Sequence, residues 1–199
     1  MIAIIDYKCG NIASVKNIIK KAGSESIITS NSYEINNCDK IILPGVGSFD
    51  YGMKKLQELK LIDVIQNHSK NNKPILGICL GMQLMAKCSE EGVEKGLSLF
   101  DAEVLKFNNK KGFPIPHMGW NTVDVKKQNP LIRINQFNKF YFVHSYYFKC
   151  NNNSDILSTT LYSKEFVSSV SKKNIYGVQF HPEKSHKHGL SVIKNFIKL

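Results

Sequence analysis

Short apolar runs alternate with helical periodicities through the first half of the chain. Four runs have the length and composition of buried strands, and they are residues 2–6, 26–29, 40–45 and 74–78. Three segments place apolar residues at helical spacing, and they are residues 11–23, 49–69 and 81–91. This alternation predicts parallel strands joined by right-handed crossovers in a doubly wound sheet. Functional residues in such sheets tend to lie at the carboxyl ends of the strands.

From about residue 97 the pattern changes to short alternating runs separated by Asn, Gly, Pro and Ser. Antiparallel or mixed strands are predicted at residues 102–107, 121–125, 139–150, 165–171 and 174–180. Residues 189–199 return to helical spacing. We therefore expect an α/β fold of three layers, with a doubly wound, mostly parallel central sheet and additional antiparallel strands in the second half. Because no linker or repeat divides the chain, residues 1–199 are expected to form a single domain.

Composition narrows the classes of function. The formal net charge is +11, but the lysines are scattered in ones and twos, which argues against nucleic-acid binding and allows an acidic protein partner. No apolar stretch approaches the roughly 20 residues of a membrane span. The N-terminus resembles a first strand and not a secretory signal, which favours the cytoplasm. The five cysteines show no C-x-x-C spacing, so we expect free thiols, no disulfide framework and no metal site.

The stretch Gly77-Ile78-Cys79-Leu80-Gly81 places a cysteine between two glycines where a strand pattern gives way to a helix pattern. Glycines two residues before and after a nucleophile allow a sharp turn, because a Cβ at either position would clash. A thiol on such a turn lies near the positive end of the following helix, which favours the reactive thiolate. Taken alone, the pattern also fits a small apolar cysteine at the end of a buried strand.

A cysteine nucleophile needs a base, and His181 is the best candidate among the six histidines. It follows the strand pattern of residues 174–180, and Glu183 stands two residues further on. In an extended segment, which Pro182 favours, residues two apart point to the same side, so Glu183 can orient the imidazole. The sequence therefore predicts a triad of Cys79, His181 and Glu183.

The loop Pro44-Gly45-Val46-Gly47 directly follows another strand-like run. Glycines here allow the backbone to approach a ligand closely. The N–H groups of this loop, together with that of Leu80, are therefore candidates for an oxyanion hole. An ordinary turn would give the same pattern if the motif stood alone.

Six motifs together resemble, in order and spacing, the class I (triad) glutamine amidotransferases, and within that class the glutaminase subunits of imidazole glycerol phosphate synthase. The motifs are PGVGSF (44–49), GICLGMQLM (77–85), SEEG (89–92), PHMGWN (116–121), YFVHSYY (141–147) and GVQFHPEKS (177–185). The resemblance covers essentially the whole chain and implies one type 1 amidotransferase domain with a flavodoxin-like arrangement. The cysteine between glycines (residues 77–81) and the sequence HPE (181–183) are typical of the whole class, whereas PGVG and PHMGWN are more specific to this subunit.

The resemblance implies that glutamine is hydrolysed to glutamate and ammonia without a cofactor. The ammonia would pass to a cyclase subunit, a HisF-type β/α barrel, in a heterodimer of histidine biosynthesis that acts as a lyase. Cys79 would attack the side-chain carboxamide, and His181 would move the thiol proton to the departing ammonia. A receiving partner is also expected on physical grounds, because ammonia released into neutral water becomes ammonium and is lost as a nucleophile.

Matching positions in the motifs implies roles for two further sets of residues. The glutamine pocket and oxyanion elements would be Gly45, Val46, Gly47, Leu80, Gln83, Glu91, Ser145 and Tyr146. The partner interface would be Trp120, Asn121, Tyr141 and Lys184. Gln83 lies one turn after the cysteine, with a solvated helix position as the alternative. Trp120 is the only tryptophan and a favoured type of interface anchor, with core packing as the alternative.

Three alternatives remain open. Copies of this subunit also occur in surface-polysaccharide pathways, where they are thought to supply ammonia for amidino sugars. A freestanding thiol hydrolase would be fully active alone, and a non-catalytic binding module would keep its function without Cys79. Lys8 and Cys9 stand where the family commonly has small residues, which leaves the local loop and the acceptor enzyme open.

Overall fold

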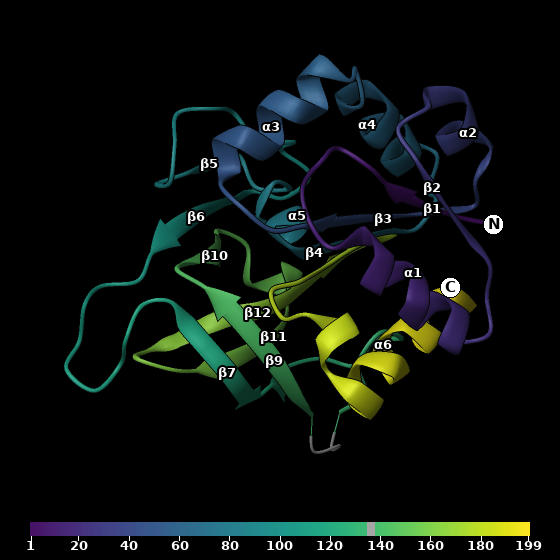
Figure 1. Cartoon of the computed structure of the whole chain (residues 1–199). Helices are drawn as coiled ribbons and strands as arrows, with labels where there is room; N and C mark the ends of the chain where they lie inside the picture. The colour runs from purple at the N-terminus through teal and green to yellow at the C-terminus, as the bar shows by residue number, and fades with distance from the viewer. Residues whose placement is uncertain (135–137) are drawn as a thin grey trace.

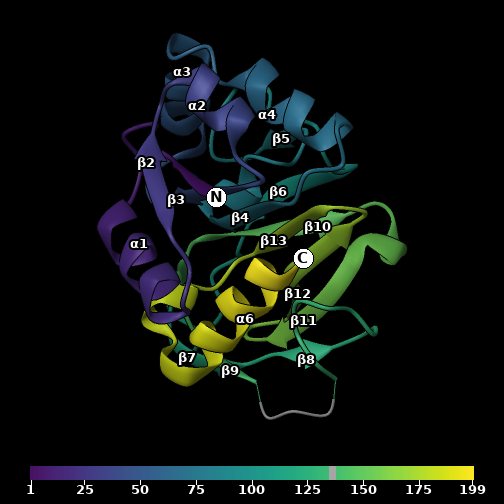
Figure 2. The ribbon, with the colours of Figure 1, turned by 90° about the vertical axis from the view of Figure 1, so that its right-hand side faces the viewer.

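The computed structural model describes residues 1–134 and 138–199 and shows three layers (Figure 1). Helices α2, α3 and α4 cover one face of the central sheet, and α1 and α6 lie on the other face (Figure 2). The α-helices are α1 (Ile12–Lys21), α2 (Ser32–Asn37), α3 (Phe49–Glu58), α4 (Ile62–Lys70), α5 (Leu80–Gln83) and α6 (His186–Lys198). The 3₁₀ helices are η1 (Asn153–Asp155) and η2 (Pro182–Lys184).

The strands follow the predicted runs closely. They are β1 (Ile2–Ile5), β2 (Ser26–Thr29), β3 (Lys40–Gly45), β4 (Ile75–Cys79), β5 (Cys88–Ser89), β6 (Ala102–Lys106), β7 (His117–Thr122), β8 (Asp124–Val125), β9 (Lys139–His144), β10 (Tyr146–Cys150), β11 (Ile156–Leu161), β12 (Glu165–Lys172) and β13 (Ile175–Val178). Helix α2, strands β5 and β11 and the two 3₁₀ helices were not predicted, and residues 117–120 of β7 lie outside the predicted run of residues 121–125. Elements α2 and β5 are very short, and β11 is largely buried although its sequence, ILSTTL, has a polar centre, so none of these gave a clear apolar pattern.

The main sheet confirms the predicted topology. Its order is β2-β1-β3-β4-β13-β12-β10-β6-β5, with β11 and β8 branching from β12. Strands β2, β1, β3, β4 and β13 are parallel to one another, whereas the pairs of β12 with β13 and of β10 with β12 and β6 are antiparallel. A separate two-stranded sheet pairs β7 with β9. The parallel position of β13 next to β4 brings the second half of the chain to the cysteine elbow.

Two hydrophobic cores fill the spaces on the two faces of the sheet. Strand β1 shows the division, because Ala3 and Ile5 belong to the core with α3 and α4, whereas Ile2 and Ile4 belong to the core with α1 and α6. All four residues of β1 are buried, as the continuous apolar run of a parallel strand predicts. Burial of each large apolar side chain stabilises the fold by roughly 1.5–3 kcal/mol.

The predicted helix over residues 49–69 consists of two helices separated by a sharp turn. Lys60 has a φ of 55°. The N–H of Leu61 donates to the carbonyl of Leu56 at 2.8 Å, and that of Lys60 donates to the carbonyl of Gln57 at 3.0 Å. These bonds form a Schellman motif, in which a residue in the left-handed region ends the helix. The break gave no sequence signal because a lysine occupies the position that usually holds glycine.

The predicted helix over residues 81–91 is wrong beyond Gln83. Helix α5 has only four residues, and the chain then folds back so that the N–H of Leu97 donates to the carbonyl of Leu84 at 2.8 Å. Residues 82–86 are all buried, whereas a surface helix would expose one face. The apolar run is therefore a buried loop in which the N–H groups of residues 84–86 donate to carbonyls of α5, while the carbonyls of the same residues accept from residues 97–100. No helix among the described residues has the length and apolar character required to cross a membrane.

We predict that Lys60→Gly stabilises the protein, because glycine adopts the left-handed conformation of this residue without steric strain. The free energy of unfolding should rise by roughly 1 kcal/mol, measured by urea denaturation. Lys60→Val should lower it, because a β-branched residue is poorly tolerated at positive φ. Equal stability of these two variants would contradict the Schellman turn.

Candidate active site

The turn at residues 77–81, which we call the cysteine elbow, is closely packed against the neighbouring backbone. Cys79 ends β4 with a φ of 53°, a conformation that stores about 1–3 kcal/mol of strain in a non-glycine residue. A Cβ on Gly81 would lie 1.7 Å from the carbonyl oxygen of Leu43, and one on Gly77 would lie 2.7 Å from the carbonyl oxygen of Gly81. The glycines on both sides of Cys79 are therefore required by the packing of β4, α5 and β3.

The short length of α5 changes the expected electrostatics of the elbow. A helix of four residues aligns few peptide dipoles, so its macrodipole is small. The interactions of the Cys79 sulfur are therefore mainly with the groups that surround it. Cys79 is 6% exposed, so those interactions take place away from bulk water.

His181 and Glu183 reach the elbow through the pairing of β13 with β4. Ile78 lies opposite Val178 in the parallel register, which places the segment after β13 beside Cys79. His181 Nδ1 lies 2.7 Å from Glu183 Oε1. The predicted extended conformation is wrong after His181, because Pro182–Lys184 form the 3₁₀ helix η2. The turn brings the carboxylate back to the imidazole, so the contact forms by a different local geometry.

The position of His181 is fixed by its backbone as well as by its ring. Its N–H donates to the carbonyl of Tyr141 at 2.9 Å, and its carbonyl accepts from Ser185 Oγ at 2.6 Å. Burial alone lowers the pKa of an imidazole, but the Cys79 thiolate and the Glu183 carboxylate raise the pKa of His181 to about 10. With Nδ1 held by Glu183, Nε2 is the nitrogen left to exchange a proton with the thiol.

Two buried residues at the elbow were missed by the sequence analysis. Gln179 Nε2 donates to Cys79 Sγ at 3.6 Å. The Tyr7 ring lies under the loop after β3, where a Cβ on Gly45 would be 2.3 Å from the Tyr7 hydroxyl oxygen. Burial, with the nearby thiols of Cys9 and Cys79, raises the pKa of Tyr7 well above its ordinary value. Both lie within quoted or adjacent motifs, but only the strand order brings them to the thiol.

The predicted oxyanion elements lie beside the cysteine. Gly45 is the register partner of Cys79 at the ends of β3 and β4. A Cβ on Gly45 would lie 2.9 Å from that of Leu80, so the loop and the elbow are in close contact. Val46 is 45% exposed, and Gly47 has a φ of 114°. The loop therefore runs from the buried elbow to the surface within two residues.

Gln83 is neither solvated nor free to donate to a ligand through its nitrogen. Its side chain is buried, and Nε2 donates to the Tyr146 carbonyl at 3.0 Å and to Gln179 Oε1 at 3.1 Å. Ser145 lies between β9 and β10, where its carbonyl accepts from the N–H of Phe107 at 3.1 Å. The structure thus brings Gln83 and Tyr146 together, with Ser145 beside them.

Glu91 caps helix α3. Its Oε2 accepts from the N–H of Phe49 at 2.8 Å, which satisfies a donor at a helix N-terminus that Ser48 leaves uncapped. Burial raises the pKa of Glu91 above its ordinary value. The carboxylate therefore anchors the loop of residues 44–48 to the SEEG segment.

Three of the predicted interface residues form one surface with a residue that was not predicted. Trp120 and Tyr141 are cross-strand partners on β7 and β9 with ring centroids 6.2 Å apart, and Lys184 Nζ lies 5.7 Å from the Tyr141 ring centroid. The ring of His186 stacks on Trp120 at 5.4 Å. We call these four residues the aromatic patch. Trp120 is 40% exposed and so is not a core residue, whereas Asn121 points to the other face of β7.

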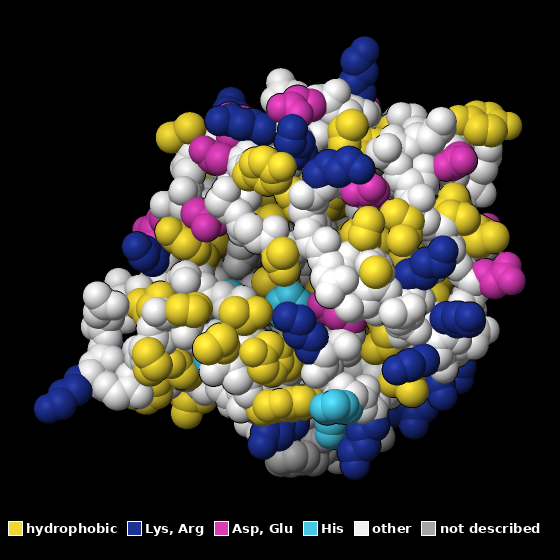
Figure 3. Space-filling model, viewed as in Figure 1, with side chains coloured by type: hydrophobic (Ala, Val, Ile, Leu, Met, Phe, Trp, Pro, Cys, Tyr) yellow, Lys and Arg dark blue, Asp and Glu magenta, His cyan; other side chains and the backbone are white. Residues whose placement is uncertain are grey.

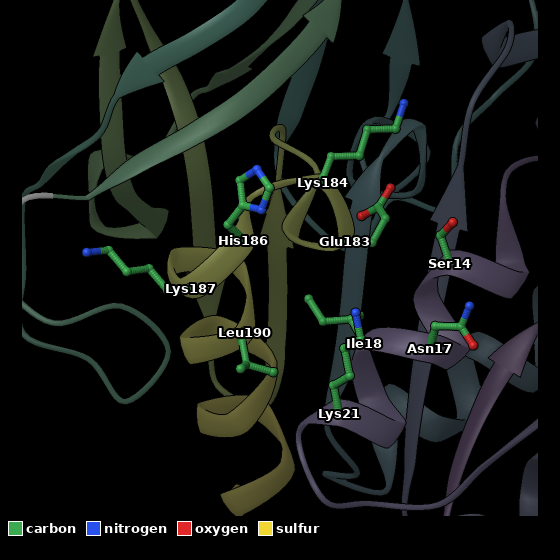
Figure 4. A pocket seen from close by; sticks show the side chains of 9 residues that line it. All are labelled: Ser14, Asn17, Ile18, Lys21, Glu183, Lys184, His186, Lys187 and Leu190. Atoms are coloured by element: carbon green, nitrogen blue, oxygen red, sulfur yellow. The ribbon is translucent and has the colours of Figure 1, made fainter.

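Hydrophobic side chains gather over β7 and β9, with histidine and lysine side chains beside them (Figure 3). A groove of about 540 Å³ between α1 and the η2–α6 segment adjoins this surface. Figure 4 shows Glu183, Lys184 and His186 on one side of the groove and Ser14 and Asn17 on the other. The groove therefore connects the aromatic patch with the carboxylate that holds His181.

Lys8, which departs from the small residues expected after the first strand, has a φ of 65°. Its N–H and its Nζ both donate to the carboxylate of Asp6, at 3.1 and 2.9 Å. A position with positive φ suits glycine, which explains why a small residue is common there. The contacts with Asp6 hold the lysine in the same conformation.

Comparison with known proteins gives one consistent family. A family model described as glutamine amidotransferase class-I matches residues 3–199. A subunit of Methanococcus maripaludis named imidazole glycerol phosphate synthase subunit HisH 2 is 54% identical over 100% of this chain and 99% of its own length. The protein named imidazole glycerol phosphate synthase subunit HisH 1 from Campylobacter jejuni is 45% identical over the full length of both chains.

Solved structures with lower identity share the fold. The structure of PurLQS from Thermotoga maritima aligns with a TM-score of 0.77 at 17% identity, covering 99% of this chain and 97% of that one. The glutaminase domain of Trypanosoma brucei CTPS with bound acivicin aligns with a TM-score of 0.66 at 19% identity, covering 99% and 93% of the two chains.

We predict that Gly81→Ala lowers the free energy of unfolding by about 3 kcal/mol or more, because its Cβ would overlap the Leu43 carbonyl. Gly23→Ala is the control for backbone strain without crowding, since Gly23 has a φ of 89° and no atom within 4 Å of an added Cβ, whereas Gly81 lies in helix α5. The loss from Gly23→Ala should be only about 1–2 kcal/mol. Chemical denaturation of both variants makes the comparison, and equal losses would exclude crowding at the elbow.

We predict that Cys79→Ala lowers the pKa of His181 from about 10, because the thiolate is the largest of the effects that raise it. Nuclear magnetic resonance titration of the imidazole measures the shift. His188, outside the site on α6, provides the internal control and should titrate as before. An unchanged pKa of His181 would show that the thiol and the imidazole are not coupled.

Proposed function

The chain belongs to the class I glutamine amidotransferases, and we propose that it acts as the glutaminase subunit of an imidazole glycerol phosphate synthase, with Cys79, His181 and Glu183 as its triad. It is an amidotransferase whose named relatives match it over their full length. The observation that carries the proposed triad is the meeting of a strained cysteine and a carboxylate-bound imidazole at the ends of two adjacent parallel strands.

The first half of the proposed reaction forms a thioester. The Cys79 thiolate attacks the side-chain carboxamide carbon of glutamine, and the carbonyl oxygen becomes an oxyanion. We propose that the backbone N–H groups of Leu80 and of the loop at Val46 and Gly47 stabilise it, which the close contact of Gly45 with Cys79 and Leu80 supports. His181, which has taken the thiol proton, gives it to the departing nitrogen as the carbon–nitrogen bond breaks, and ammonia leaves.

The second half releases glutamate. Water attacks the thioester carbon while His181 Nε2 accepts its proton, and the carbon–sulfur bond breaks to restore the Cys79 thiolate. Glu183 keeps the ring in one tautomer through Nδ1 in both halves. The raised pKa of His181 makes it a strong proton acceptor next to the anionic sulfur.

The chain is a subunit of a complex by the names of its relatives, and we propose that its partner is a cyclase subunit with a β/α barrel. Ammonia has to reach an acceptor before it is protonated in water. The aromatic patch forms the proposed contact surface, because an exposed tryptophan among polar side chains is typical of an interface anchor, whereas Asn121 lies on the other face of β7. We place the complex in the cytoplasm, where the five free thiols would persist.

We predict that Cys79→Ser reduces glutamine hydrolysis by roughly 10³-fold or more, because the nucleophile acts together with its base. Release of glutamate is measured with the cyclase subunit of the same organism and its nucleotide ligand present. Cys88→Ser is the control, since Cys88 is exposed and lies outside the site, and it should keep full activity. Retention of activity in Cys79→Ser would refute the triad.

The same assay separates the other functions. Full activity without any partner would indicate a freestanding thiol hydrolase. Stimulation by the cyclase, together with rescue of a histidine auxotroph that carries it, supports the synthase role. Stimulation without rescue would point to an acceptor in surface-sugar biosynthesis.

A further inference from the structure

A continuous chain of hydrogen bonds joins the inner side of β7 to the sulfur of Cys79. Asn121 Nδ2 lies 3.4 Å from His117 Nε2, and His117 Nδ1 lies 3.0 Å from His144 Nε2. His144 Nδ1 lies 2.7 Å from the carbonyl oxygen of Tyr146. That oxygen also accepts a hydrogen bond from Gln83 Nε2. Gln83 Nε2 donates in addition to Gln179 Oε1, and Gln179 Nε2 donates to Cys79 Sγ.

The direction of every bond in this chain is set by its backbone partners. A carbonyl only accepts, so His144 Nδ1 carries the proton and His144 Nε2, in the neutral ring, accepts. His117 Nδ1 must therefore donate to it, and His117 Nε2 accepts from Asn121. Asn121 is oriented in turn, because its Nδ2 also donates to the carbonyl of Leu161 at 2.9 Å.

The two glutamines are oriented by the same carbonyl. Gln83 Nε2 has two protons, one for the Tyr146 carbonyl and one for Gln179 Oε1. This leaves Gln179 Nε2 to donate to the sulfur. Reversal of either amide would place two oxygens or two donors against each other in a buried site, which costs about 1–3 kcal/mol.

From this arrangement we propose that His117 and His144 are positioning residues of the glutaminase site, which hold the Tyr146 carbonyl and, through Gln83 and Gln179, set the orientation of the Cys79 thiol. The inference rests on the proposed function for its catalytic meaning, but the geometry of the thiol can be measured independently. Neither histidine touches the reacting atoms. Their effect passes through the amide groups and the backbone of β10.

The surroundings of His117 and His144 keep the hydrogen bonds between β7 and Cys79 in a single arrangement. Burial lowers the pKa of His117 to about 4 and that of His144 to about 3, so both rings are neutral near pH 7. The His117 ring is stacked between Tyr162, at 4.0 Å between centroids, and Phe142, at 5.0 Å. The rings therefore have a fixed orientation as well as a fixed tautomer.

Two variants of His144 test the proposal. An asparagine amide nitrogen falls near the position of Nδ1 and can still donate to Tyr146, whereas a glutamine amide falls near Nε2 and cannot. We expect His144→Gln to lower kcat for glutamine roughly three- to tenfold in the complex with the cyclase, with a smaller change in KM. His144→Asn should restore most of this loss.

Alkylation of Cys79 by iodoacetamide in the isolated chain gives a second readout, followed by peptide mass spectrometry over a range of pH. His144→Gln should change the rate and pH profile at Cys79, and His144→Asn should leave them near those of the wild type. The exposed Cys88 is the internal reference in every sample. If His144→Gln does not fold, His117→Gln, which removes the donor to His144, replaces it and His117→Asn is its control.

Equal behaviour of the asparagine and glutamine variants in both assays would overturn the proposal and show that the rings only fill space. Because alkylation needs neither glutamine nor a partner, the proposal on thiol orientation can succeed when the wild type fails to hydrolyse glutamine. Such failure would count against the proposed function alone.

Discussion

The parallel pairing of β4 with β13 is the interaction on which the site depends. Its register sets Gly77 opposite Gly177 and carries both strands to the same edge of the sheet, where Cys79 and His181 leave it. A shift of the register by one residue would turn every side chain of one strand to the opposite face. The two cores on either side of the sheet oppose such a shift, because the alternate residues of both strands are buried in them.

The register can form only because these strands carry glycine where neighbouring elements approach. A Cβ on Gly177 would lie 2.7 Å from a side-chain carbon of Met82, just as the glycines of the elbow admit β3 and α5. Because these elements pack so closely, the backbone of Cys79 keeps a positive φ that it would not adopt in a flexible chain. Packing of the two cores thus maintains the strained backbone of Cys79, which is the usual relation between a rigid scaffold and a strained residue.

Local sequence patterns predicted most of the fold, but they could not give features that depend on distant partners. The strands at residues 2–6 and 40–45 and the helix at 11–23 follow from apolar spacing alone. The parallel pairing of β13 with β4 was not predictable, because the apolar pattern of residues 174–180 does not indicate which strand they pair with. The end of α5 also depends on distant residues, since its buried loop is completed by the segment near Leu97.

The candidate site shows the same division. Motif spacing predicted Cys79, His181 and Glu183 as the triad, and the structure places Glu183 against the His181 ring through a 3₁₀ turn and not along an extended strand. Gln179 was quoted within a motif but had no assigned role, because only the folded chain shows its amide at the sulfur. The presence of reactive groups was therefore readable, but the groups that orient them were not.

The separation of the two partner strands in sequence has a consequence for biosynthesis of the protein. When a ribosome completes β4 it has made the thiol, but it has still to translate residues 80–199, which include β13 and the segment with His181 that follows it. Nascent chains and truncated products then lack the imidazole beside the sulfur, since contacts of long sequence separation form late in folding. The cysteine and the imidazole can therefore come together only after the last strand of the sheet, β13, has been made.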